Sequence, residues 1–307
     1  MTDTHNAPEA TSEAIPQAAA PAEPQPSADV VPFDRPSALT EPGPRPRILA
    51  IANQKGGVGK TTTAINLGTA LAAVGERVLI IDLDPQGNAS TGLGVDQRPL
   101  STFDVLSGSA TIAEARVATH VPRLSIVPAT IDLMAFEREA ASSSGKHYRL
   151  RDCLAAMGAA ETPDESTSYV LIDCPPSLNL LTVNALAAAD AVLVPLQCEF
   201  FALEGLAQLL STVEEIRVRL NPKLQIHGVV LTMYDQRTSL SDQVVADVRR
   251  VLGDKVYATI IPRNVRVAES PSHGKPVLLY DYRCSGSQAY IRLASEVIER
   301  ERRIRAA

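Results

Sequence analysis

The chain has 307 residues, 45% of them hydrophobic and 21% charged, so it is long enough to bury a core as one large domain or two small ones. Tryptophan is absent and aromatic residues are only 4% of the chain, which makes this core aliphatic. The formal net charge of −6 excludes a protein coated in basic surface, so any nucleic-acid binding would have to come from a local patch.

Cysteine usage and hydropathy indicate a cytoplasmic protein. The four cysteines are far apart and form no CxxC pair, and we find no signal peptide, which predicts reduced, mostly buried thiols. No apolar run reaches the length needed to span a bilayer, so we expect no membrane partner.

Residues 1–46 differ in composition from the rest of the chain. They contain ten of the 22 prolines, much alanine and almost no periodic apolar residues. Such a segment cannot bury enough apolar surface to offset the entropy of ordering, and we predict a disordered tail.

From residue 47 onward, short apolar runs alternate with helical patterns. Strands are predicted at 47–53, 77–84, 124–129, 169–174, 191–196, 226–234 and 256–262, and helices at 62–75, 202–219, 241–252 and 287–300. This alternation is typical of a doubly wound α/β fold, a mostly parallel sheet with helices on both faces. We expect residues 47–307 to form a single domain.

A phosphate-binding loop is predicted between the first strand and the first helix. Residues 54–61, QKGGVGKT, almost match G-x-x-x-x-G-K-[ST], but Gln54 stands where the first glycine is expected and a second lysine, Lys55, follows it. Lys60 is placed to reach the β/γ-phosphates, the Thr61 hydroxyl to ligate Mg²⁺, and Thr62 to donate to a phosphate oxygen. The loop that lets backbone N–H groups approach the anion comprises Gly56, Gly57, Val58 and Gly59.

Together with LIIDLDPQGNAS (79–90) and VLIDCPPSL (170–178), this loop resembles the ParA/Soj partitioning ATPases. They belong to the ParA/MinD group of ATPases with a deviant Walker A motif, and the resemblance covers essentially all of residues 47–300. It implies that Lys55 is the signature lysine, which crosses a dimer interface to the phosphates bound by the other subunit. A second cation, supplied by the other subunit, neutralises negative charge on the transferred phosphoryl group and makes dimerisation depend on ATP.

Carboxylates follow two of the predicted strands. Asp82 and Asp84 share one face at the carboxyl end of their strand, where α/β sheets bind ligands. The resemblance places Asp84 in the first switch, and we assign it to the attacking water and, with Thr61, to the magnesium site. Asp173 fits the Walker B role of holding Mg²⁺ through water, and the two prolines at 175–176 stiffen the second switch that follows it. Asp82 remains either a structural cap or a neighbour of the Mg²⁺ shell.

The resemblance also implies a base site and a DNA surface in the C-terminal part of the chain. Met233, Pro262 and Asn264 are the candidates to flank the adenine. Arg237 and Arg266 match arginines that the family uses to bind double-stranded DNA nonspecifically, although such charges are often only a solvated face. Further basic residues that could extend the patch are Arg263, Lys275 and Arg292.

Three other functions fit the sequence less well than partitioning does. A MinD-type membrane-cycling ATPase ends in an amphipathic helix, whereas this sequence ends EVIERERRIRAA, charged on all sides. A metallocluster carrier needs paired cysteines that bridge a dimer, and the cysteine spacing here does not suggest them. A bacterial tyrosine kinase would have a tyrosine-rich tail, and this tail has no tyrosine. We therefore expect a cytoplasmic, nucleoid-associated Mg²⁺-dependent ATPase that forms an ATP-dependent homodimer and is stimulated by a ParB-like protein. A related ATPase that positions another cargo is the alternative.

Overall fold

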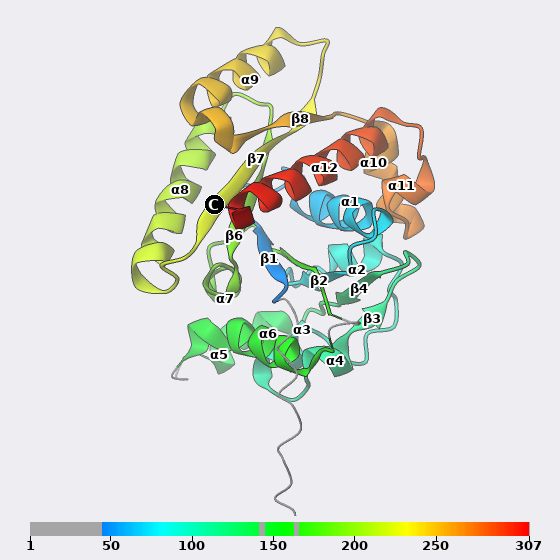
Figure 1. Cartoon of the computed structure of the whole chain (residues 1–307), viewed down its shortest axis with the longest axis vertical. Coiled ribbons are helices and arrows are strands. Elements are labelled where there is room, and N and C mark those ends of the chain that lie inside the picture. Colours follow the sequence, from blue (N-terminus) through cyan, green and yellow to red (C-terminus); the bar gives the residue numbers. More distant parts are fainter. Residues whose placement is uncertain (1–44, 141–144, 163–165, 307) are drawn as a thin grey trace, which may run out of the picture. The chain divides into compact units, whose positions relative to one another are not determined.

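The strands of the computed structural model form one eight-stranded sheet (Figure 1). The structure describes residues 45–140, 145–162 and 166–306. The strand order is β3-β4-β2-β5-β1-β6-β7-β8, with β3 antiparallel to β4 and the other neighbouring pairs parallel. The strands are β1 (Arg47–Ile51), β2 (Val78–Asp82), β3 (Val117–Ala118), β4 (Leu124–Val127), β5 (Tyr169–Asp173), β6 (Ala191–Gln197), β7 (Gln225–Tyr234) and β8 (Val256–Pro262).

All seven predicted strands are confirmed, and each begins and ends within a few residues of its predicted range. The short antiparallel strand β3 was not predicted. It has two residues, one half-buried and one exposed, and so lacks the continuous apolar run that identifies a strand buried on both faces.

Helices connect the strands and cover the sheet. The four predicted helices are confirmed as α1, α8, α9 and α12, whereas the shorter helices and 3₁₀ turns were not predicted. The helices are α1 (Lys60–Ala73), α2 (Asn88–Gly92), α3 (Thr102–Ser107), α4 (Ile112–Ala115), α5 (Leu133–Glu139), α6 (Arg149–Ala160), α7 (Leu180–Ala188), α8 (Ala202–Arg219), α9 (Ser239–Leu252), α10 (Val265–Glu269), α11 (Val277–Tyr280) and α12 (Ser285–Ala306), with 3₁₀ turns η1 (Lys146–Tyr148), η2 (Gly253–Lys255) and η3 (Ser270–His273).

Each central strand buries alternate residues in two separate cores, because successive side chains of a strand point to opposite faces. In β1, Leu49 and Ile51 pack in the core that contains α1 and α12, while Ile48 and Ala50 pack in the core that contains α6, α7 and α8. Figure 1 shows α1 and α12 on one side of the strands and α8 on the other. Helices on both faces confirm the doubly wound fold.

Parallel pairing brings the carboxyl ends of β1, β2 and β5 together. Asp82, the last residue of β2, is the register partner of Asp173, the last residue of β5, and Asp173 is also paired with Ile51 of β1. The segments that leave these three strands therefore meet at one edge of the sheet, where ligands bind in open α/β folds.

The described residues all belong to one compact unit. The predicted disordered tail, except for Arg45 and Pro46, lies outside the described residues. Among the helices of the described ranges, none combines the length and apolar character that crossing a bilayer requires.

Candidate nucleotide-binding site

The loop between β1 and α1 has a backbone that only glycine adopts without strain at two positions. Gly57 and Gly59 have φ values of +75° and +91°, in the left-handed region. Gly59 is the N-cap of α1 and brings no side chain to cap the helix, which begins at Lys60. The first N–H groups of α1 and the partial positive charge of its N-terminus are therefore directed at the loop, as in an anion site.

Contacts from three other elements hold this loop in place. The Thr232 hydroxyl, near the end of β7, donates to the carbonyl of Val58 at 2.9 Å. Asn53 donates through Nδ2 to the carbonyl of Pro195 in β6 at 2.7 Å. Gln54 donates through Nε2 to the Thr212 hydroxyl of α8 at 3.2 Å. Gln54, which stands in place of the expected first glycine, thus connects the loop to α8.

The two lysines of the loop lie in different environments. Lys60 is only 7% exposed, and its Nζ donates to the backbone carbonyl of Lys55 at 3.0 Å. Burial lowers the pKa of Lys60, although the negative charge of Asp173 opposes this shift. The side chain of Lys55 is 39% exposed and forms an ion pair with Glu199 of the same chain. Lys60 therefore faces the carboxyl edge of the sheet, whereas Lys55 faces the β6–α8 connection.

Asp173 is fully buried and its carboxylate lacks a hydrogen-bond partner. In the described part of the chain, neither of its carboxylate oxygens is hydrogen-bonded. Burial, reinforced by the charge of Asp82, raises the pKa of Asp173 well above its usual range, and the nearby Thr61 hydroxyl partly offsets this. A buried carboxylate of this kind is stabilised by a cation, and oxygen donors from Asp173 and Thr61 fit Mg²⁺.

Protein side chains alone do not form a complete Mg²⁺ shell in the described part of the chain, and the predicted contribution of Asp84 to the metal stays a prediction. Across the described ranges, no group of three or more His, Cys, Asp or Glu side chains is arranged to hold a metal ion. Nucleotide sites typically hold Mg²⁺ through one or two carboxylates together with phosphate oxygens and water. The residues present therefore suit a magnesium–nucleotide complex.

Asp82 has a structural role in this arrangement. Its Oδ2 accepts hydrogen bonds from the backbone N–H and the hydroxyl of Ser90, at 2.9 and 2.6 Å, and its Oδ1 accepts from the N–H of Asp84 at 3.3 Å. Burial raises the pKa of Asp82 to about 6, against the effect of these hydrogen bonds. Of the two roles left open by the sequence, these contacts favour the structural one, because they anchor α2 to the end of β2.

Asp84 lies where the two predicted switch segments meet. It is 8% exposed, and its Oδ1 accepts a hydrogen bond from the N–H of Gln86 at 3.0 Å. It lines a cavity of about 300 Å³ together with Pro175 and Pro176, which follow β5. Among the described residues, no hydrogen bond engages the second carboxylate oxygen of Asp84, which leaves it available to orient a water molecule.

The three predicted base-site residues lie in different structural settings. Met233 has a positive φ of 53°, and its Cε lies 3.9 Å from the position that a β-carbon on Gly59 would occupy, so it borders the phosphate loop. Pro262 ends β8 and pairs in register with Tyr234. The Asn264 amide caps α10 by accepting from the N–H of Arg266 at 2.8 Å, and it donates to Ser285 at 3.0 Å. Asn264 therefore has a structural role whether or not it contacts a base.

The two predicted DNA-binding arginines are exposed but already paired. The side chain of Arg237 is 79% exposed and donates to both carboxylate oxygens of Asp235, at 2.9 and 2.7 Å. The side chain of Arg266 is 54% exposed and pairs with Glu269 at 2.7 Å and Asp281 at 3.5 Å. A DNA phosphate would compete with these carboxylates for the arginines.

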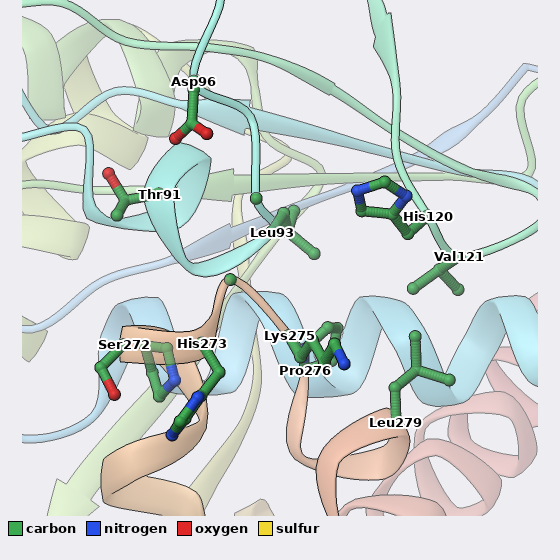
Figure 2. A pocket seen from close by; sticks show the side chains of 13 residues that line it. Thr91, Leu93, Asp96, His120, Val121, Ser272, His273, Lys275, Pro276 and Leu279 are labelled. Carbon is green, nitrogen blue, oxygen red and sulfur yellow. The ribbon is translucent and has the colours of Figure 1, made fainter.

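A separate cavity of about 590 Å³ lies between the end of α2 and the segment from η3 to α11 (Figure 2). Its lining includes Thr91 and Asp96 on one side and His273 and Lys275 on the other. Of the candidate residues, only Lys275 lines it, so this cavity is distinct from the phosphate loop and the switch segments.

Four residues of the site were missed from the sequence. Thr232 and Glu199 lie near or just past the carboxyl ends of β7 and β6, and Ser90 and Thr212 lie on helices. A charged residue within two positions of the end of a buried strand is a signal that could have identified Glu199. Ser90 bonds to Asp82, only eight residues away, whereas Thr212 accepts from Gln54, 158 residues away, and no local sequence pattern indicates either contact.

Comparisons with known proteins agree with the resemblance seen in the motifs. A family model described as AAA domain matches residues 46–226. The chromosome partitioning protein ParA of Caulobacter vibrioides is 65% identical over 258 residues, which cover 83% of this chain and 95% of that protein. The sporulation initiation inhibitor protein Soj of Bacillus subtilis is 50% identical over 82% of this chain and 98% of that protein.

A solved structure shares the fold at substantial identity. Cobyrinic acid a,c-diamide synthase from Mycobacterium smegmatis, with bound ATP analog and magnesium, superposes with a TM-score of 0.70 and 39% identity. The match covers 81% of this chain and 93% of that one. The motifs, the sheet topology and these relatives lead to one assignment: the chain belongs to the ParA/Soj family of chromosome partitioning proteins.

Proposed function

We propose that the chain is a cytoplasmic partitioning ATPase that hydrolyses ATP with Mg²⁺ and switches its affinity for DNA with its nucleotide state. The observation that carries the proposal is the buried, unpartnered carboxylate of Asp173 beside the buried Lys60 at the N-terminus of α1. The bound ATP analog and magnesium of the Mycobacterium smegmatis relative support it. The names of the relatives favour a chromosome as the cargo over another body, and partitioning over membrane cycling.

Each residue of the site has a part in this activity. The loop N–H groups and Lys60 bind the phosphates, and Thr61 and Asp173 hold Mg²⁺, which neutralises phosphate charge when bound. Asp84, in the cavity between the switch segments, orients the water that attacks the terminal phosphate. Met233 and Pro262 border the base, beyond the glycine loop.

The second lysine gives the activity its dependence on a dimer. Lys55 contacts the phosphates bound by a second copy of the chain, so that ATP closes a dimer with two nucleotides at its interface. The dimer binds the nucleoid nonspecifically through basic residues, and a ParB-like protein stimulates hydrolysis and release. Unequal affinity of the two nucleotide states for DNA drives the cycle.

Lys55→Ala is the experiment that tests this proposal. We expect the monomer to bind ATP with nearly unchanged affinity, because Lys60 and the loop N–H groups remain. ATP-dependent dimerisation and stimulated turnover are expected to be lost, because no other cation replaces Lys55 on the partner's phosphates. Light scattering with and without ATP measures dimerisation, and phosphate release measures turnover. Lys223→Ala, an exposed lysine after α8, is the matched control. Normal ATP-dependent dimers of Lys55→Ala would show that Lys55 does not act in trans.

Charge reversal tests the DNA surface. Arg237→Glu and Arg266→Glu are expected to weaken ATP-dependent binding to any duplex alike, and each to reduce the log–log salt slope by about one. ATP binding and dimerisation are expected to be unchanged, because both arginines are exposed.

The measurement is binding to two unrelated duplexes across a salt series, with Arg217→Glu on α8 as the control. Arg217 is also exposed and paired with a carboxylate, Glu214. Sequence preference, binding without ATP, or no effect of either reversal would place the DNA surface elsewhere.

A further inference from the structure

Three consecutive residues between β1 and the glycines of the phosphate loop, residues 53–55, all contact one neighbouring unit of the fold, β6, α8 and the connection between them. Asn53 donates to Pro195 and Gln54 to Thr212, and the ammonium of Lys55 pairs with Glu199, two residues after the end of β6. The second half of the loop, from Gly56 onward, makes no ion pair with this unit among the described residues. The loop is thus divided between a part bound to β6 and α8 and a part open to an anion.

The backbones on both sides of the Lys55–Glu199 pair are fixed. The N–H of Lys55 donates to Asn53 Oδ1 at 3.0 Å, and its carbonyl accepts from Lys60 Nζ at 3.0 Å. The N–H of Glu199 donates to the carbonyl of Gln197 at 2.9 Å, and its carbonyl accepts from the N–H of Ala202 at 3.0 Å. With these backbone contacts in place, rotation of its side chain is the simplest way for Lys55 to change partner.

The pair is also accessible enough to exchange. The side chains of Lys55 and Glu199 are 39% and 29% exposed, so water screens their attraction. Half-exposed ion pairs are weak, and a group of phosphate charges is a stronger partner for an ammonium than one carboxylate.

We propose that Glu199 is a positioning residue that holds Lys55 within its own chain and thereby restrains ATP-dependent dimerisation. The inference rests on the proposed trans role of Lys55. To reach the phosphates on a second copy, Lys55 leaves Glu199, and the lost ion pair is a cost of forming the dimer. Because each protomer contributes one Lys55, the cost is counted twice per dimer.

Glu199→Gln removes the charge while keeping the size of the side chain. An exposed ion pair changes an equilibrium constant by a factor of about 1.4 to 5, so loss of two pairs is expected to tighten the ATP dimer about 2- to 25-fold. Unstimulated turnover at limiting protein concentration is expected to rise with the dimer population. ATP affinity of the monomer is expected to stay within about twofold of wild type, since Glu199 touches none of the predicted phosphate ligands except Lys55.

The experiment measures dimer dissociation constants with a nonhydrolysable ATP analogue by analytical ultracentrifugation, for wild type, Glu199→Gln, Glu199→Ala and Lys55→Ala. Glu204→Gln, an exposed acid in the first turn of α8, is the matched control and is expected to behave as wild type. Tighter dimers for both Glu199 variants support the inference. A double variant with Lys55→Ala and Glu199→Gln should dimerise no better than Lys55→Ala alone, because the effect of Glu199 passes through Lys55.

The outcomes separate this inference from the proposed function. If Lys55→Ala abolishes dimerisation while Glu199→Gln matches wild type, the restraint is absent and the trans role stands. If Glu199→Gln weakens the dimer, Glu199 supports the interface and the inference is overturned. If Lys55→Ala dimerises normally, the trans role fails and the inference fails with it.

Discussion

Replacing Lys60 by alanine is expected to weaken ATP binding by about 30- to 5,000-fold, which corresponds to the loss of about 2–5 kcal/mol for one partner of a buried, hydrogen-bonded charge pair. Lys60 is 7% exposed and lies within reach of the charges of Asp173 and Asp84. Its removal leaves these buried carboxylates without their nearest cation, so negative charge repels the incoming phosphates as well. Lys55 cannot substitute for Lys60, because its side chain faces the β6–α8 connection, where it contacts Glu199, and not the carboxyl edge that Lys60 faces.

Isothermal titration with MgATP measures this loss of affinity, with Lys223→Ala as the control for removing a lysine charge. Thermal unfolding monitored by circular dichroism shows whether the variant is folded at the assay temperature. The carbonyl of Lys55 loses its hydrogen bond from Nζ in this variant, which is a modest cost in an otherwise intact loop. An ATP affinity within a few-fold of wild type in a folded variant would contradict the assignment of Lys60.

The sequence predicted the fold well because its strands are buried on both faces. In β2 every residue is buried, and residues 78–81 are all apolar, which gives a continuous apolar signal that a single sequence contains. The edge strand β3 and short helices such as α2 and α4 have no such signal. Their formation depends on caps and neighbours, as in α4, where Thr111 and Glu114 form a capping box.

The phosphate loop was predictable for a related reason, since its glycines, lysine and threonine are contiguous. What the sequence could not provide are contacts that depend on the folded geometry of turns and helix ends. The hydrogen bonds of Asp82 to Ser90, which distinguish it from Asp84, appear only once α2 folds back on β2. Likewise, the ion pairs of Arg237 and Arg266 depend on the local geometry of their carboxylate partners. The sequence indicates that these arginines are present but gives no information on their competition with DNA.

Replacing Asp84 by alanine is expected to separate binding from hydrolysis. The carboxylate lies in the cavity between the switch segments, and none of its described contacts involves the glycine loop. ATP binding and dimerisation are therefore expected to remain near wild type, while turnover falls by about 10²- to 10⁴-fold, the usual contribution of a group that positions or activates a nucleophile. The variant should consequently stay bound to DNA in the presence of ATP.

Single-turnover phosphate release measures the chemical step, and a DNA dissociation time course measures the locked state. Asp82→Ala is the informative comparison, because its effect is expected on stability: loss of Asp82 leaves the N–H and hydroxyl of Ser90 without their acceptor, at about 1–3 kcal/mol for each buried group left unsatisfied. A lowered unfolding temperature for Asp82→Ala and a slow but stable Asp84→Ala would distinguish an anchor from a water-positioning carboxylate. Turnover of Asp84→Ala near the wild-type rate would count against this role and make Asp82, whose carboxylate lies at the same edge of the sheet, the next candidate.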